Sequence, residues 1–113
     1  MKEDKFDEVI EQSLNQAREV LIIKGKEYRR NQNAMHNFDI SVQQSTTGET
    51  REDVIWSMAR KHFISIQDIR TDIREGNLPS RDLVDEKYGD LINYLLLEKA
   101  SIIDKLDKVK LPF

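Results

Sequence analysis

The stretch D-E-K-Y-G-D-L-I-N-Y-L-L-L, residues 85–97, sets acidic side chains into an otherwise strongly apolar segment. Glu86, Asp90 and Asn93 follow the i, i+4, i+7 spacing that places side chains on one face of a helix. Two carboxylates one turn apart, with an amide beyond them, suit Mg²⁺, which takes oxygen ligands and keeps waters that it can share with a phosphate. The spacing predicts a helix and suggests a metal-assisted reaction on a phosphorylated substrate.

The same face has a simpler interpretation as the solvated side of an amphipathic helix. Against it, like charges at i, i+4 repel each other by a few tenths of a kcal/mol. Gly89 also costs a helix interior about 0.8–1.0 kcal/mol relative to Ala, which suggests that another backbone or a ligand approaches closely there. Spacing alone leaves both interpretations open.

Working outward, the sequence predicts two further helices. One runs from about Asp4 into residues 24–28 and carries a regular apolar face. The next follows Thr50, an N-cap with Asp53 in the capping-box position, and runs to about Arg74. Its apolar face, like that of the last helix, repeats with helical spacing: Ile55, Met58, His62, Ile66, Ile69 and Ile73.

The last helix begins after Ser80, and its wide apolar arc predicts that it is the most buried of the three. Residues 31–48 are rich in Asn, Gln, Ser and Thr, and we predict a long loop there. The tail, residues 105–113, ends in L-P-F, which can pack on a neighbour. We therefore expect one all-α domain over residues 1–113, with its core at about 5–104. It would be a bundle of three main helices completed by homo-oligomerisation.

Composition limits the classes of function. The chain has 113 residues, 38% apolar and 35% charged, with a net charge of −3 and no cysteine. The acidic balance argues against binding a nucleic-acid polymer, and the lack of cysteine excludes disulfides and a thiol nucleophile. The apolar runs are too short for a membrane span, so we expect a cytoplasmic protein without a membrane partner.

A second group of candidate site residues lies in K-G-K-E-Y, residues 24–28. Glu27 could supply a third carboxylate to the metal, and Lys24 could meet a phosphate. The alternative is a helix end at which lysines favour the helix dipole and Gly25 acts as the breaker.

The middle helix supplies the remaining candidates. His62 could contact phosphate, although a lone His on an apolar face is usually a hydrogen-bonded core residue. Lys61 and Asp68 belong to a polar stripe that would join the site if it faced the last helix and would mean nothing special if it faced water. Trp56 and Phe63 lie on another side, where they could pack at a subunit interface or stack on a base.

Taken together, K-G-K-E-Y, M-A-R-K-H-F-I-S-I-Q-D-I and E-K-Y-G-D-L-I-N-Y resemble the MazG-like all-α nucleoside triphosphate pyrophosphohydrolases, above all the small phage-type members. The resemblance covers about residues 5–104, and its most specific part is the last helix. It implies a homodimer or homotetramer that hydrolyses a (deoxy)nucleoside triphosphate to the monophosphate and pyrophosphate with Mg²⁺, or Mn²⁺ in its place.

On this resemblance Glu86 and Asp90 would be metal ligands, joined by Glu27. Glu27 and Asp68 would be the candidate catalytic acids that orient or deprotonate the attacking water. The candidate substrate contacts would be Lys24, Lys61, His62 and Asn93.

The chain departs from the family pattern in two places. The E-E-x-x-E run expected on the preceding helix is replaced by K-H-F-I-S, residues 61–65, and the last motif reads E-x-x-x-D where the family has E-x-x-D. The departures leave several alternatives: a reorganised metal site, a modified nucleotide as substrate, or a non-catalytic helical protein that binds a partner or a nucleotide.

Overall fold

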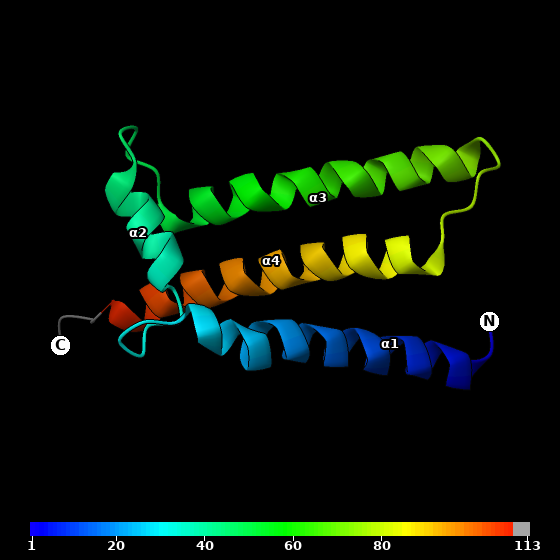
Figure 1. The fold of residues 1–113 in the computed structure, drawn as a ribbon, viewed down its shortest axis with the longest axis horizontal. Helices are drawn as coiled ribbons and strands as arrows, with labels where there is room; N and C mark the ends of the chain where they lie inside the picture. Colours follow the sequence, from blue (N-terminus) through cyan, green and yellow to red (C-terminus); the bar gives the residue numbers. More distant parts are fainter. Residues whose placement is uncertain (110–113) are drawn as a thin grey trace.

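The computed structural model describes residues 1–109 of the chain, apart from the side chain of Tyr28. Within that range it is helical and contains no strand (Figure 1). The elements are α1 (Glu3–Arg18), η1 (Glu19–Ile23), η2 (Lys24–Tyr28), α2 (His36–Gln44), α3 (Arg51–Arg74) and α4 (Arg81–Lys108). The predicted all-α class is confirmed, with four α-helices where three were expected. The L-P-F end of the tail lies outside the described residues.

Helix α3 begins and ends on local sequence signals. The Thr50 hydroxyl accepts a hydrogen bond from the Asp53 amide (3.1 Å), and the Asp53 carboxylate accepts one from the Thr50 amide (2.9 Å), which completes the predicted capping box. At the other end, Gly76 takes a positive φ of 87°. The Asn77 amide donates to the Asp72 carbonyl (2.8 Å), as in a Schellman motif.

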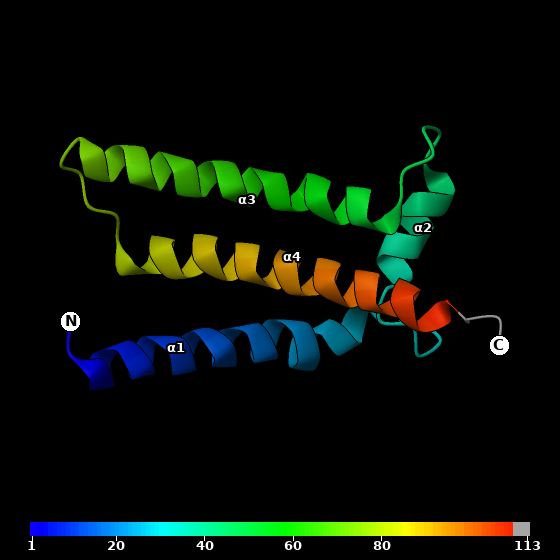
Figure 2. The same ribbon diagram turned by 180° about the vertical axis from the view of Figure 1, so that it is seen from behind.

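Helix α4 starts as predicted, because the Ser80 hydroxyl accepts a hydrogen bond from the Leu83 amide at 3.1 Å. It returns antiparallel to α3 and lies between α3 and α1 in both views of the ribbon (Figures 1 and 2). At 28 residues α4 is about 42 Å long. It therefore forms the spine against which the other two long helices pack.

The first predicted helix is helical along its whole length but not regular. After α1 the backbone widens into a π-helix, η1, and then tightens into a 3-10 helix, η2. The η1 segment contains Val20, Ile22 and Ile23, β-branched residues that crowd a helix turn, and Gly25 follows in η2. These changes of helical pitch alter the direction of the chain before α2.

The prediction of a loop over residues 31–48 is wrong for its middle part, which forms α2 (His36–Gln44). The chain turns at Asn31 and Gln32, which both have positive φ. Asn33 then organises the start of the helix: its Oδ1 accepts from the Met35 amide (2.9 Å) and its Nδ2 donates to Asp39 (2.9 Å). The helix could not be recognised from an apolar pattern, because its sequence is polar and these side-chain contacts stabilise its start.

The core lies along the α3–α4 contact and is drawn mainly from α3. Its buried apolar residues are Ala17, Met35, Val54, Ile55, Ala59, Ile66 and Ile69, and Met58 and Ile73 of the predicted α3 face are exposed. The prediction that the last helix is the most buried is wrong within one chain. The only buried residues of α4 are Gly89, Asn93 and Ser101, whereas much of its apolar arc is exposed: Tyr88, Ile92, Leu95, Leu96, Ile102 and Ile103.

The exposed arc has a simple cause: α4 packs mainly on α3 and α1, and its apolar residues extend around more of its circumference than these two helices cover. A contiguous apolar surface of this kind is typical of an interaction site. No helix among the described residues has the length and apolarity needed to cross a membrane.

Candidate functional site

The structure gives the three predicted residues of the α4 face different surroundings. Glu86 is exposed, with its carboxylate 3.7 Å from the Lys87 ammonium. Asp90, one turn on, is half-buried on the side of α4 that meets α3. Asn93 is 7% exposed and so belongs to the interior. Along the predicted face, the exposure of the side chains therefore decreases from Glu86 through Asp90 to Asn93.

Asp90 meets His62 of α3. Its Oδ2 lies 3.4 Å from His62 Nδ1, and the imidazole stacks on the ring of Tyr94, with centroids 5.3 Å apart and planes inclined by 23°. The two predicted site residues, which are 28 positions apart in sequence, are thus brought together by the antiparallel packing of α3 and α4. A carboxylate beside one ring nitrogen fixes the orientation of an imidazole and leaves the other nitrogen able to exchange a proton.

Asn93 has an unpaired polar atom. Its Oδ1 is buried and accepts no hydrogen bond within the described part of the chain. Buried amide oxygens are rarely left without a donor, and such an atom calls for an explanation such as a ligand, an ion or a water. Asn93 is therefore the residue of the predicted set whose surroundings depart most from the ordinary.

Gly89 is explained by packing within the chain. A Cβ built there would lie 2.3 Å from Nε2 of Gln16, which reaches over from α1 and donates to the Asp85 carbonyl at 3.0 Å. The prediction that another backbone or a ligand approaches Gly89 is wrong, because the close group is a side chain of α1. Gly89 consequently gives no separate support to a ligand site.

The other predicted site residues are spread over the surface. Lys24 and Glu27 are exposed in η2, and Lys61 and Asp68 are exposed on α3, away from its buried face. Among the described residues, no three His, Cys, Asp or Glu side chains gather closely enough to hold a metal ion. Within one chain, therefore, neither Glu27 nor Asp68 joins Glu86 and Asp90, and the metal site stays a prediction.

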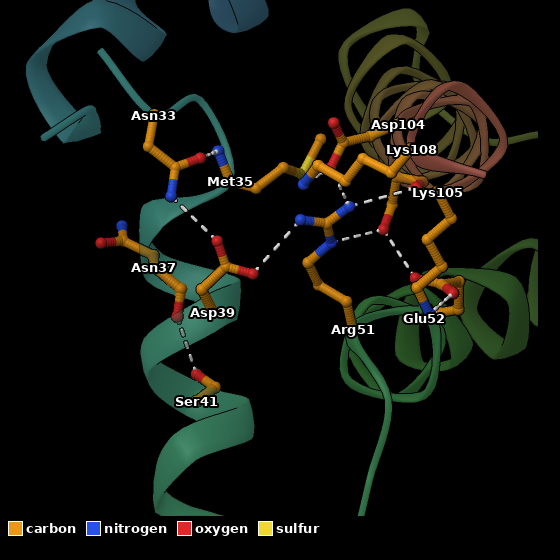
Figure 3. A network of polar contacts seen from close by, with 11 residues as sticks. Asn33, Met35, Asn37, Asp39, Ser41, Arg51, Glu52, Asp104, Lys105 and Lys108 are labelled. Carbon is orange, nitrogen blue, oxygen red and sulfur yellow. Dashed lines mark hydrogen bonds and ion pairs between the residues drawn. The ribbon is translucent and has the colours of Figure 1, made fainter. Parts of the chain in front are cut away.

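A polar network that was not predicted from the sequence is centred on Arg51, the first residue of α3 (Figure 3). The Arg51 guanidinium is buried and donates to Asp39 (3.2 Å), to Asp104 (2.8 Å) and to the hydroxyl (2.7 Å) and carbonyl (3.1 Å) of Ser101. One side chain thus joins α2, α3 and α4. A cation in the first turn of a helix is unfavourable beside the positive end of the helix dipole. The position of Arg51 was therefore a signal in the sequence that acidic side chains lie near it.

The network extends to Glu52, the residue that follows Arg51 in the first turn of α3. The Ser101 hydroxyl donates to Glu52 at 2.6 Å, and Glu52 also pairs with Lys105. Burial acts against the charged forms of Arg51 and Glu52. The hydrogen bonds outweigh it, so that the pKa of Arg51 is raised and that of Glu52 is lowered. Hydrogen bonds from Arg51, then from Lys108, lower the pKa of Asp104.

Comparison with known proteins adds no relative. Searches against protein-family models, curated proteins and solved structures each found no match for this chain.

Proposed function

We propose that the chain acts as a nucleotide pyrophosphohydrolase-like enzyme, which converts a (deoxy)nucleoside triphosphate to the monophosphate and pyrophosphate and works as a homo-oligomer. The observation that carries the proposal is the contact between His62 and Asp90, which sets an imidazole beside the acid of the predicted metal-binding face. The motifs that resemble the MazG-like family give the same direction.

The donor set of this face suits Mg²⁺. Magnesium in nucleotide enzymes is commonly held by one or two carboxylates together with waters and phosphate oxygens, and it does not need a closed protein cage. Glu86 and Asp90, one turn apart on α4, would hold it. Oδ2 of Asp90 is the oxygen that lies 3.4 Å from His62, and in this proposal Oδ1 would bind the ion. When bound, the ion would neutralise phosphate charge.

The proposed reaction is hydrolysis at the α-phosphorus, and it releases one proton from the attacking water. A water oxygen forms a bond to the α-phosphorus, the bond from that phosphorus to the bridging oxygen breaks, and pyrophosphate leaves with the electron pair. The proton from the water needs an acceptor. In this proposal His62 would take this proton, because Asp90 lies 3.4 Å from Nδ1 and the opposite ring nitrogen, Nε2, would face the water. Tyr94 holds the imidazole plane by stacking.

One further residue has a binding role in this proposal. The unpaired Oδ1 of Asn93 would accept a hydrogen bond from a metal-bound water, and because Asn93 is buried it would not contact the nucleotide directly. Lys61 faces solvent, so the polar stripe to which it belongs gives no support to the site.

The test is release of pyrophosphate from a panel of canonical dNTPs and NTPs with Mg²⁺ and with Mn²⁺. Asp90→Asn should abolish release, and His62→Gln should lower it strongly. Asp107→Asn changes an exposed acid farther along the same helix and should leave the rate unchanged. Release that survives in Asp90→Asn, or no release from any substrate by folded wild type, would contradict the proposal.

A second function, a non-catalytic helical interaction protein, is favoured by the exposed apolar arc of α4 and by the carboxylates missing from residues 61–65. Thermal melting with and without Mg²⁺ plus nucleotide separates the two, because a ligand that binds only the folded state raises the melting temperature by mass action. No shift with any divalent ion would favour the interaction protein.

A further inference from the structure

A cavity of about 410 Å³ lies where η1, the segment leading into α2, and the C-terminal half of α4 meet. This volume is within the range of small-molecule sites. Met35 and Phe38 contribute to the cavity wall from the α2 side, and Leu97 and Ala100 from α4. The cavity lies apart from the contact between His62 and Asp90 and shares no residue with it.

The lining of this cavity is apolar except for two side chains, Arg29 and Asn37. The Arg29 guanidinium donates to the Leu21 carbonyl at 3.2 Å, and within the described residues no carboxylate pairs with it. Among the described residues only Arg51 and Arg81 pair with carboxylates, and what distinguishes Arg29 from the other arginines is that it lines this apolar cavity. A guanidinium without a counter-charge at the edge of an apolar cavity favours an anionic group on a ligand.

The wall of the cavity is held in place from outside. The Met35 amide donates to Asn33, whose own amide group donates to Asp39, and Asp39 in turn accepts from Arg51 (Figure 3). Met35 is buried at the end of this chain of contacts. The segment that bounds the cavity is therefore connected to α3 by hydrogen bonds, which fix the position of this wall.

We propose that this cavity binds a small aromatic molecule that carries one anionic group. The ring system would contact Met35, Phe38 and Leu97, since aromatic rings make favourable contacts with thioethers and with other rings. The anionic group would meet Arg29. A nucleobase suits the cavity poorly, because Asn37 alone could pair with its polar edge. This inference does not depend on the proposed hydrolase function.

The test uses two probes with the same aromatic body, 8-anilinonaphthalene-1-sulfonate and the uncharged N-phenyl-1-naphthylamine, titrated by fluorescence against the full-length chain. The sulfonate should bind to wild type about tenfold more tightly than the neutral probe, the size of one charge-assisted hydrogen bond. Arg29→Gln should remove that difference and leave the neutral probe unchanged. Arg30→Gln, at a position that does not line the cavity, should leave both affinities unchanged.

Ala100→Phe, which places a phenyl ring on the cavity wall, should weaken saturable binding of both probes strongly. Leu106→Ser lowers the apolar character of the exposed surface and should leave both affinities unchanged. The proposal is overturned if Arg29→Gln leaves the preference for the sulfonate intact. It is overturned equally if Leu106→Ser weakens the probes as much as Ala100→Phe does. Displacement of the probes by deoxynucleoside monophosphates would overturn the assigned ligand class in favour of nucleotides.

Discussion

Replacing Arg51 with Ala should be among the most destabilising single substitutions in this chain. The guanidinium is 9% exposed and donates four hydrogen bonds that join α2 and α4 to the start of α3. Removing one partner of a fully buried ion pair costs about 3–5 kcal/mol. Here the side chains of Asp39 and Asp104 are 36% and 39% exposed, so water can still solvate their carboxylates when the guanidinium is removed. We therefore expect a loss of about 2–3 kcal/mol.

The assay is urea denaturation followed by far-ultraviolet circular dichroism, with Arg81→Ala as the matched control. Arg81 also pairs with an acid, Asp85, at 3.0 Å, but both side chains are about half exposed. The control should lose less than about 1 kcal/mol. Arg51→Lys keeps the charge but not the planar fork, and should fall between the control and Arg51→Ala. If Arg51→Ala costs no more than Arg81→Ala, the network does not hold the three helices together.

The same network contributes to the pH dependence of stability, together with the capping box, in which hydrogen bonds with Thr50 lower the pKa of Asp53. Asp104 and Glu52 have lowered pKa values when folded. Their contribution is therefore present above the unfolded pKa and is lost as the pH falls through the folded pKa. The free energy of unfolding of wild type should fall below about pH 5. In Arg51→Ala the decline should be shallower, because the strongest cause of the shift at Asp104 is gone. An equal slope in both proteins would contradict this account.

Three further substitutions probe single contacts. Gly89→Ala added to Gln16→Ala should stabilise the chain by about 1 kcal/mol relative to Gln16→Ala alone, since the clashing amide is gone and Ala favours the helix; unchanged denaturation midpoints would contradict this. Asn93→Leu should raise the free energy of unfolding by about 1 kcal/mol by removing an unpaired buried oxygen, while pyrophosphate release falls; a less stable variant would show that the oxygen has a partner. Asp39→Asn should weaken binding of both fluorescent probes without changing any residue that lines the cavity, and unchanged affinities would show that its wall does not depend on Arg51.

What the sequence predicted well was local. The start of α3 depends on Thr50 and Asp53, three residues apart, and the start of α4 on Ser80 and Leu83. Such hydrogen bonds can be inferred from neighbouring residue types alone. Helix periodicity likewise placed Ile55 correctly in the core, where it is fully buried.

What the sequence did not predict depends on contacts between distant residues. Asp104 and Arg51 are 53 positions apart, and nothing local marks them as partners. Helix α2 was missed because its polar composition gives no apolar pattern and because Asp39 is held by side chains, Asn33 on one side and Arg51 on the other. Asn93 was predicted on the acidic face, but packing of α1 and α3 on either side of α4 buries it.

The acidic face and the apolar arc of α4 can be separated by position. At about 100° per residue, Leu95 and Ile102 lie about 140° and 120° around the helix from Asp90, and Ile92 lies about 160° away on the other side. A second copy that covered this arc would therefore pack on the side of α4 that faces away from Asp90 and His62. It could bury the exposed apolar residues without closing the contact between His62 and Asp90 to substrate. Charged substitutions on the arc should therefore change the oligomeric state, whereas Asp90→Asn should change pyrophosphate release. The proposed association through the arc and the proposed hydrolysis can thus be tested separately.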